Sequence, residues 1–520
     1  MRAASRFAVI LLGSAGSLAL GCRATIPDDT FACTTDEQCP DGFRCAGGFC
    51  NRTPGVMDAG GVDAALDAGP ALDADPFDGG EADGAPRDAS ADAGSHADGG
   101  GTERSMAECS DGVDNDDDGR TDCADPECCD SGACTAGVLA CECPAIGDRT
   151  VIDVRGTVPA GTEWACDHLY HLEGVVNVEG GDLTVHPGTL VRAGRGAGLF
   201  IERDARLLAL GTAARPIHFT SAEPEGARAP GDWHGLFVFG QAPINDPSGS
   251  SVIPGFPADI VAYGGTDPTH DCGRIEYVNI TFGGQDQNVN LALIACGTRT
   301  EVHYVHTAHS ADTNVYVGGG TVTMDHVTSW ASRDEGFLYS EGWVGSAQFL
   351  FVGAAGGAGI RGRTSFVDAG RLPYSTPAIW NATVTNSVVA GVELLSGGGI
   401  HMGNSIVAGV MGGGACFAPD ATSAPRIPAD LDLRHSILWS CGGTMGLGSG
   451  AGALGDAGVY ANRFVDPVLN VGTPPPGSPA TTGATTPPAG LDATTYLGAF
   501  TPAPAGTNDW SDGWADYRPN

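Results

Sequence analysis

The sequence of 520 residues contains no lysine, and all 26 of its basic residues are arginine. It therefore cannot form the common phosphate-binding loop that contacts a nucleotide through a lysine. With 63 acidic residues, the formal net charge is −37 at pH 7. A chain of this sign gains nothing from neutralising phosphates, which argues against nucleic acid and anionic lipid surfaces as partners. The acidic excess favours binding of divalent cations.

Long apolar segments are also scarce, and the clearest one lies at the N-terminus, where Phe7 to Leu20 follows Arg2 and Arg6. This run is too short to span a membrane and is typical of a signal peptide. Its end, Leu18-Ala19-Leu20-Gly21-Cys22, resembles a bacterial lipobox. We expect Cys22 to carry lipid and to anchor the protein in the outer membrane, at the surface of a Gram-negative cell. Ordinary signal-peptidase cleavage after residues 1–21 is the alternative.

The cysteine count supports export. Of 17 cysteines, 16 remain when Cys22 is set aside, and these can pair in an oxidising compartment. After a tether at 22–32, residues 33–50 hold four cysteines in a segment too small for a core, which predicts two disulfides. Zinc is the alternative, but this segment has no CxxC motif and no histidine. Residues 51–107 are mostly Asp, Ala and Gly, which predicts a disordered acidic linker.

A second cysteine-rich segment, residues 108–144, contains the run DNDDDGRTDCAD at 114–125. Oxygen-bearing side chains and a glycine occupy the positions that a calcium loop requires. This spacing predicts one bound calcium, with the Arg120 carbonyl and five carboxylates as ligands: Asp114, Asp116, Asp118, Asp122 and Asp125. An acidic turn held by disulfides is the alternative. The surrounding Cys-x-Asp-Gly-x-Asp-Asn-Asp-x-Asp-Gly pattern resembles a module of myxobacterial exported proteins.

Short alternating apolar pairs recur from about residue 145, as in Leu183/Val185 and Ile217/Phe219. Turn glycines at 188, 211 and 235 repeat with spacings of 23 and 24 residues. Very short strands with a fixed period of this size predict an all-β solenoid over residues 145–472. We expect a Pro/Thr/Gly-rich loop at 473–490 and a closing segment at 491–520, whose aromatic residues cap the last coil.

Two pairs of cysteines have the spacing of one coil. Cys272 and Cys296 are 24 residues apart, and Cys416 and Cys441 are 25 apart. One coil of separation places each pair on neighbouring turns, within reach of a disulfide. We therefore expect both pairs to be bonded.

Several short motifs strengthen this interpretation. They are Pro187-Gly188-Thr189, Gly211-Thr212, Pro216-Ile217-His218-Phe219-Thr220-Ser221, Gly231-Asp232-Trp233-His234-Gly235 and the closing Gly498-Ala499-Phe500 with Trp510 and Trp514. Together they resemble surface lipoproteins of myxobacteria and Bacteroidota that have a right-handed parallel β-helix of the pectate-lyase-like superfamily. The resemblance covers most of 170–517 and implies fold and location, but no particular activity.

Possible chemistry concentrates in one column of acidic residues. Asp312 and Asp334 are 22 residues apart, and Asp286 lies 26 before Asp312. Coils stacked in register would place these carboxylates roughly 5 Å apart, with Arg361 nearby in sequence. Such a column would have raised pKa values or hold a cation. The alternative is that these aspartates cap turns.

Histidines at 303, 306, 309 and 326 also suggest a metal site at first sight. Residues three apart on a strand point to opposite faces, so His303 and His306 should not converge. We therefore do not expect zinc.

The sequence favours a calcium-stabilised outer-surface lipoprotein whose β-helix has a structural or binding role without catalysis. Two alternatives stay open: a lyase or hydrolase acting on acidic polysaccharide at Asp312, Asp334 and Arg361, and a scaffold subunit of an envelope assembly. Expected partners are the membrane, through the lipid anchor, and polysaccharide or envelope proteins.

Overall fold

The structure, a computed structural model, describes residues 105–113, 115, 121–122, 128–129, 134, 143–507 and 509–518, and the backbone of two strands near the N-terminus. The chain divides into two units, residues 1–56 and 57–520. In the first unit, β1 (Phe43–Ala46) pairs antiparallel with β2 (Phe49–Arg52). Within the described residues, no helix is long and apolar enough to cross a bilayer.

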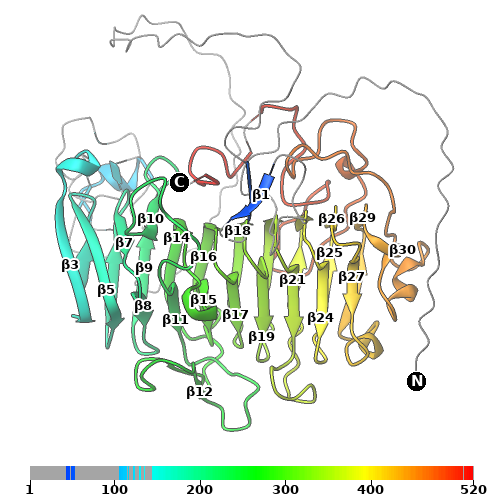
Figure 1. The fold of residues 1–520 in the computed structure, drawn as a ribbon, viewed down its shortest axis with the longest axis horizontal. Helices are drawn as coiled ribbons and strands as arrows, with labels where there is room; N and C mark the ends of the chain where they lie inside the picture. The colour runs from blue at the N-terminus through cyan, green and yellow to red at the C-terminus, as the bar shows by residue number, and fades with distance from the viewer. Residues whose placement is uncertain are drawn as a thin grey trace, which may run out of the picture. The chain divides into compact units, whose positions relative to one another are not determined.

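The second unit contains a right-handed parallel β-helix (Figure 1). Its 26-stranded sheet starts at β3 (Thr150–Val158) and ends at β30 (Gly442–Leu447). Each strand pairs in parallel with the strand one coil later, so β15 (Val289–Ile294), β17 (Thr313–Gly318) and β19 (Phe337–Ser340) lie in sequence along one side. The predicted fold class is thus observed.

The coils present three faces, which we number in the order in which the chain visits them within one coil. Face 1 contains the second half of β5 (His168–Val178), β8 (Gly198–Ile201), β11 (Leu236–Phe239), β15, β17, β19, β21 (Ala358–Arg363), β24 (Ala390–Leu395), β27 (Ala415–Pro419) and β30.

Faces 2 and 3 share several long strands that bend from one face to the other. Face 2 contains β4 (Thr162–Trp164), β6 (Asp182–Val185), β9 (Arg206–Leu210), the first halves of β14 (Gly273–Thr281), β16 (Glu301–Ala308), β18 (Thr323–Trp330) and β20 (Ser346–Gly353), then β22 (Ala378–Trp380), β25 (Ile400–Gly403) and β28 (Leu431–Arg434). Face 3 contains β7 (Leu190–Ala193), β10 (Ile217–Ser221), the second halves of those long strands, β23 (Thr383–Thr385), β26 (Ile406–Ala408) and β29 (Ile437–Trp439).

One left-handed residue per coil makes the bend between faces 2 and 3. Its φ lies between 49° and 53° in seven coils, at Tyr277, Tyr304, His326, Phe349, Asn381, Asn404 and His435. A non-glycine residue in this region costs roughly 1–2 kcal/mol. The side chains offset part of this cost by stacking, since the Tyr277 and Tyr304 rings are 4.4 Å apart and those of Tyr304 and His326 are 4.5 Å apart.

The interior is filled by residues that repeat at the same coil position. Val278, Val305, Val327 and Leu350 are neighbours across successive coils of face 3 and are at most 1% exposed. They belong to one apolar cluster that runs along the whole β-helix. A coil buries its inner side only against its neighbours, which explains the strict repeat.

Disulfides join coils as the spacing predicts. The structure bonds Cys272 to Cys296 and Cys416 to Cys441, with Cα separations of 5.7 and 5.4 Å. Cys143 and Cys166 form a further bond at the start of the β-helix, and Cys109 is bonded to Cys128.

The C-terminal segment does not cap the last coil, so that expectation is wrong. Instead it runs back along face 3 toward earlier coils (Figure 1). The amide side chains of Asn404, Gln348 and Asn279 each donate to and accept from its backbone, at Thr485, Asp492 and the Trp514–Asp516 stretch respectively. We call residues 478–518 the tail.

The reason lies on the outer side of face 3, where several side chains are apolar. Ile406 and Ile437 pack with Ala480 and Leu497 of the tail. Phe351 packs with Ala499 and Phe500. Since these outward side chains would otherwise face water, covering them with the tail stabilises the fold.

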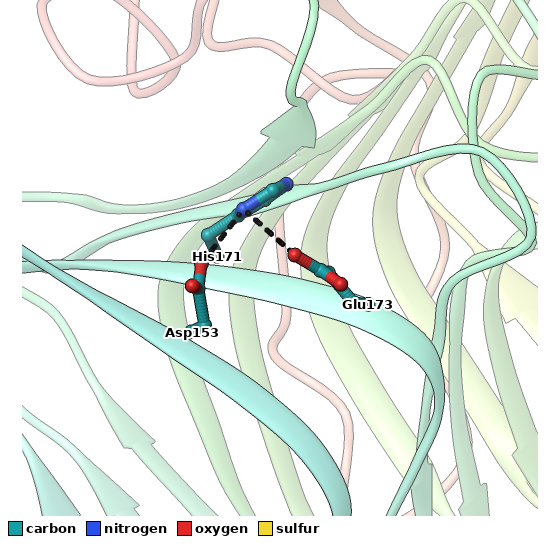
Figure 2. A group of neighbouring side chains, drawn as sticks. All are labelled: Asp153, His171 and Glu173. Atoms are coloured by element: carbon teal, nitrogen blue, oxygen red, sulfur yellow. Dashed lines mark hydrogen bonds and ion pairs between the residues drawn. The ribbon is translucent and has the colours of Figure 1, made fainter.

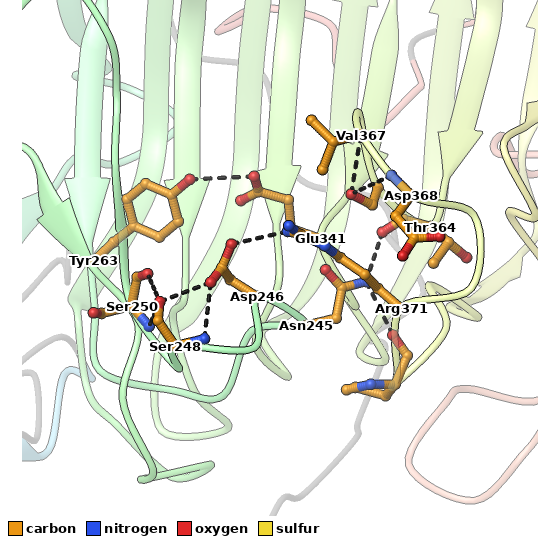
Figure 3. Close-up of polar contacts among 12 residues, drawn as sticks. Asn245, Asp246, Ser248, Ser250, Tyr263, Glu341, Thr364, Val367, Asp368 and Arg371 are labelled. Atoms are coloured by element: carbon orange, nitrogen blue, oxygen red, sulfur yellow. Dashed lines mark hydrogen bonds and ion pairs between the residues drawn. The ribbon is translucent and has the colours of Figure 1, made fainter.

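Two long loops leave the coils between faces 1 and 2. The first, after β11, contains β12 (Ser251–Val252) and β13 (Ala262–Tyr263), and the second follows β21. Figure 3 shows how they are joined: Arg371 pairs with Asp246 at 2.9 Å, and Asn245 donates to the Thr364 carbonyl at 2.7 Å. Each loop thus fixes the other against the coils.

Candidate functional site

The structure brings Asp312 and Asp334 together at the start of two neighbouring strands of face 1. Together with Glu335, they offer carboxylate oxygens that all lie within 4.8 Å of one another. The coils are in register here, because the Asp334 N–H donates to the Asp312 carbonyl at 3.1 Å. We call these three residues and Arg361 the acidic cluster.

Arg361, on β21, is the cation of this cluster. Its Nη1 contacts a carboxylate oxygen of Glu335, and its Nε lies 2.6 Å from Oε2 of Glu393 on β24. Asp334 is further away, at 3.7 Å from Nη1. The arginine side chain is only 12% exposed. It therefore ties three successive coils together through two well-covered ion pairs.

Asp286 lies outside the cluster, so the predicted column of three aspartates is wrong at this position. The Ala311 N–H donates to the Gly283 carbonyl, which makes Gly284, rather than Asp286, the coil neighbour of Asp312. Asp286 sits in a short 3-10 turn, η7 (Gln285–Gln287), is exposed, and accepts a hydrogen bond from the Gln285 side chain. Between the Gly283–Ala311 and Val289–Thr313 pairings, this coil has five residues where the next coil has one, so four additional residues move Asp286 out of register.

Asp312 is the electrostatically unusual group. Burial raises its pKa, the neighbouring charge of Asp334 raises it further, and Arg361 partly opposes both, which leaves the pKa at about 6. Locally it is Ser310 that caps this turn, since its Oγ accepts from the Asp312 N–H at 3.2 Å. Asp312 can therefore take up or release a proton near pH 6.

This gives a prediction for the pH dependence of stability. A carboxyl group whose folded pKa is raised stabilises the fold below its unfolded pKa, near 3.8, and loses that contribution as the pH rises through about 6. Asp312→Asn should therefore raise the free energy of unfolding by about 1 kcal/mol at pH 7 and by almost nothing at pH 3.5. Thermal melts of both proteins across this range measure the difference.

Asp286→Asn is the matched control, because it makes the same change on an exposed aspartate outside the cluster. Equal effects of the two substitutions at pH 7 would contradict the electrostatic cost that we assign to ionised Asp312.

The cluster is a poor fit for calcium as it stands. Calcium takes six to eight oxygen ligands. Glu335 is already held by Arg361 and by the Thr313 hydroxyl, which donates to its Oε2 at 2.7 Å. Two aspartates then remain, and the same arginine limits the negative charge that they present.

A second acidic group surrounds a histidine on the first coils, at Asp153, His171 and Glu173 (Figure 2). Both carboxylates face the same imidazole nitrogen, Nδ1, at 3.1 Å from Asp153 and 3.8 Å from Glu173. Glu173 also pairs with Arg155. This is the arrangement of a surface polar network, in which one ring nitrogen faces two carboxylates.

The structure keeps His303 and His306 apart, as their spacing on one strand predicts. His303 and His326 both bind Asp325, through Nδ1 atoms 2.7 and 2.6 Å from its oxygens. Burial opposes ionisation of Asp325, but hydrogen bonds from these two histidines lower its pKa to about 2. His306 lies on face 3 beneath the tail, where its Nε2 is 2.9 Å from the Asp516 carbonyl. The bend at Tyr304 separates it from His303.

The remaining predicted sites fall largely outside the described residues. Cys22 lies there, as do Asp114, Asp116, Asp118, Arg120 and Asp125. Asp122 is described, and its Oδ1 accepts from the Gly112 N–H at 3.1 Å.

The match to a protein family agrees with this architecture. Residues 156–434 match the family described as the pectate-lyase-like beta helix domain. Among solved structures, the chain is similar to the crystal structure of the Dettilon tailspike protein (gp208), with 12% identity and a TM-score of 0.19. The match covers 56% of this chain and 55% of the tailspike chain. No curated protein sequence matches.

Proposed function

We propose, from the premise that this chain belongs to the pectate-lyase-like β-helix family, that it is an outer-surface lipoprotein whose β-helix binds polysaccharide without cleaving it. The observation that carries the proposal is the position of Arg361. A lyase of acidic polysaccharide needs a basic side chain that is available to take a proton from the substrate. Here the arginine of the acidic cluster is buried between Glu335 and Glu393 and serves as a link between coils.

Binding is tested by electrophoresis of the full-length protein through native gels that contain polysaccharide. A panel of acidic and neutral polymers should include one that retards the protein relative to a polymer-free gel. Equal mobility with every polymer would contradict a polysaccharide-binding role.

A second candidate, hydrolysis of acidic polysaccharide, is favoured by the pKa of Asp312, because a general acid needs a carboxyl group that stays protonated near neutral pH. In that case Asp334 would act as the second carboxylate of the pair. Release of reducing ends from polygalacturonate by the wild type, lost in Asp312→Asn, would establish this role. The binding proposal expects no release from either protein.

The lipid anchor gives a direct prediction for localisation. Cys22→Ser should release the protein from the membrane fraction, because the acyl chains supply the affinity that the acidic chain lacks. Partitioning into a detergent phase measures this. An unacylated mature protein that begins several residues away from Cys22 would contradict the anchor.

The calcium loop gives a prediction about metal binding. Five carboxylates in twelve residues repel one another, so calcium should order the segment, with little effect on the distant β-helix. The full-length protein should bind calcium by calorimetry and gain protection from proteolysis within 105–145. Asp118→Ala should weaken binding at least about tenfold, because it removes a central ligand. Equal protease sensitivity with calcium and with chelator would refute the site.

A further inference from the structure

A pocket with a volume of about 470 Å³ lies on the outer side of face 3 at the end of the tail. Its floor is made by outward side chains of β7, β10 and β14, including Arg192, His218 and Thr281. Arg149 reaches it from the start of the β-helix, and Arg228 from the loop after β10. The tail contributes Asp516 and Arg518. The pocket thus occupies the part of face 3 next to the end of the tail.

The charge of this pocket is opposite to that of the chain. Five arginines line it: Arg149, Arg192, Arg215, Arg228 and Arg518. Only two acidic residues, Glu225 and Asp516, are among its lining residues. A net charge of −37 makes such a gathering of arginines unusual here, because they are drawn from a total of 26 spread over 520 residues. A local positive field in an acidic protein attracts an anion to this place.

The arginines are held in position by the backbone. Arg149 donates from Nε to the Pro144 carbonyl at 3.0 Å and from Nη1 to the Gly188 carbonyl at 3.1 Å. Arg228 donates from Nε to the Glu223 carbonyl at 3.3 Å. Carbonyl partners orient a guanidinium group without removing its charge.

Arg192 contributes a buried hydrogen-bond donor to the pocket. Its Nε is buried and has no hydrogen-bond partner in the described part of the chain. Burial lowers the pKa of Arg192, and the charge of Arg228 lowers it further, with Glu225 opposing both. A buried donor without an acceptor is costly, so a ligand oxygen placed against it would be stabilising.

We propose that this pocket binds an oxyanion group, a carboxylate, sulfate or phosphate, of an organic ligand. Arginine forms two parallel hydrogen bonds with each of these groups. The volume is within the range of small-molecule sites and exceeds the space that a single inorganic anion fills. The inference stands on the pocket alone, and only the choice of a uronate as the probe rests on the proposed function.

The test uses calorimetry with the full-length protein and three probes: trigalacturonate, the neutral maltotriose, and inorganic phosphate. Trigalacturonate should bind saturably, more weakly as salt rises, and maltotriose should not bind at this pocket. Arg192→Gln combined with Arg228→Gln should weaken trigalacturonate binding at least about tenfold, because two charged hydrogen-bonding groups are lost. Arg203→Gln, an exposed arginine outside the lining, is the control and should leave affinity within about twofold.

The outcomes separate the two proposals. If phosphate binds and the double substitution abolishes it, while trigalacturonate does not bind, the anion pocket stands and a uronate ligand is excluded. If polysaccharide retards the double variant as much as the wild type in native gels, binding to polysaccharide stands without this pocket. Absence of binding of both anions to the wild type, or unchanged affinity in the double variant, would overturn the inference.

Discussion

Replacing both Leu497 and Phe500 with alanine is expected to lower the free energy of unfolding by about 5 kcal/mol, because each side chain is almost fully buried against the outer side of face 3. Leu497 packs with Ile406 and Ile437, and Phe500 lies 5.1 Å from the Phe351 ring between centroids. The double variant should melt at a lower temperature, and limited proteolysis should cleave the tail before the coils.

Trp439→Ala is the matched control, since this aromatic side chain is also on face 3 but is 41% exposed. It should change stability by less than about 1 kcal/mol. A tail that stays as resistant to proteolysis in the double variant as in the wild type would show that its packing on face 3 does not hold it.

Low pH should weaken the packing of the tail on face 3, because His306 lies in this contact. Burial, opposed in part by the Asp516 carbonyl, lowers the pKa of His306 to about 3, with His218 and His309 also disfavouring a charge there. A histidine whose folded pKa lies below its unfolded value near 6.5 makes the fold less stable as the pH falls from 6.5 toward 3, because the unfolded chain binds the proton more readily. The loss should reach about 4 kcal/mol at pH 3.

His306→Asn removes this titration. The variant should be less stable than the wild type at pH 7, where it loses the bonds to Thr328 and Asp516, and its stability should depend less on pH between 6.5 and 3. Protease release of the tail and thermal melts at a series of pH values measure both effects. An identical slope for variant and wild type would contradict the assignment. The opposite pH dependence of Asp312 makes the two groups distinguishable.

The period of the coils was the most predictable feature of the sequence. Turn glycines and the cysteine pairs Cys272–Cys296 and Cys416–Cys441 report the length of one turn, and the turn length sets which residues are neighbours. The same logic brought Asp312 next to Asp334. It failed at Asp286, where four additional residues shift the register. It also missed Glu393, since a long loop after β21 places this residue 32 positions beyond Arg361.

The course of the tail was not predictable from periodicity. Side chains of a three- or four-residue strand alternate inward and outward, and apolar residues at outward positions, such as Ile406 and Phe351, look the same in sequence as those of the core. The bend between faces 2 and 3 could not be predicted from the sequence either. It is made by Tyr277, Tyr304 and other residues that do not mark a left-handed conformation as glycine does.

The arginine pocket was also hidden, because its members come from positions 149 to 518. No local motif joins them, and the overall charge points the other way. Only the stacking of coils and the return of the tail bring them to one place.

The central claim, that the β-helix binds polysaccharide without cleaving it, is tested most directly by size-exclusion chromatography with light scattering. Polygalacturonate of known mass is incubated with the full-length protein and calcium, and the mixture is then analysed. The account predicts that polymer elutes together with the protein and has an unchanged mass after the protein is removed. A fall in polymer mass with the wild type that is absent with Asp312→Asn would contradict it.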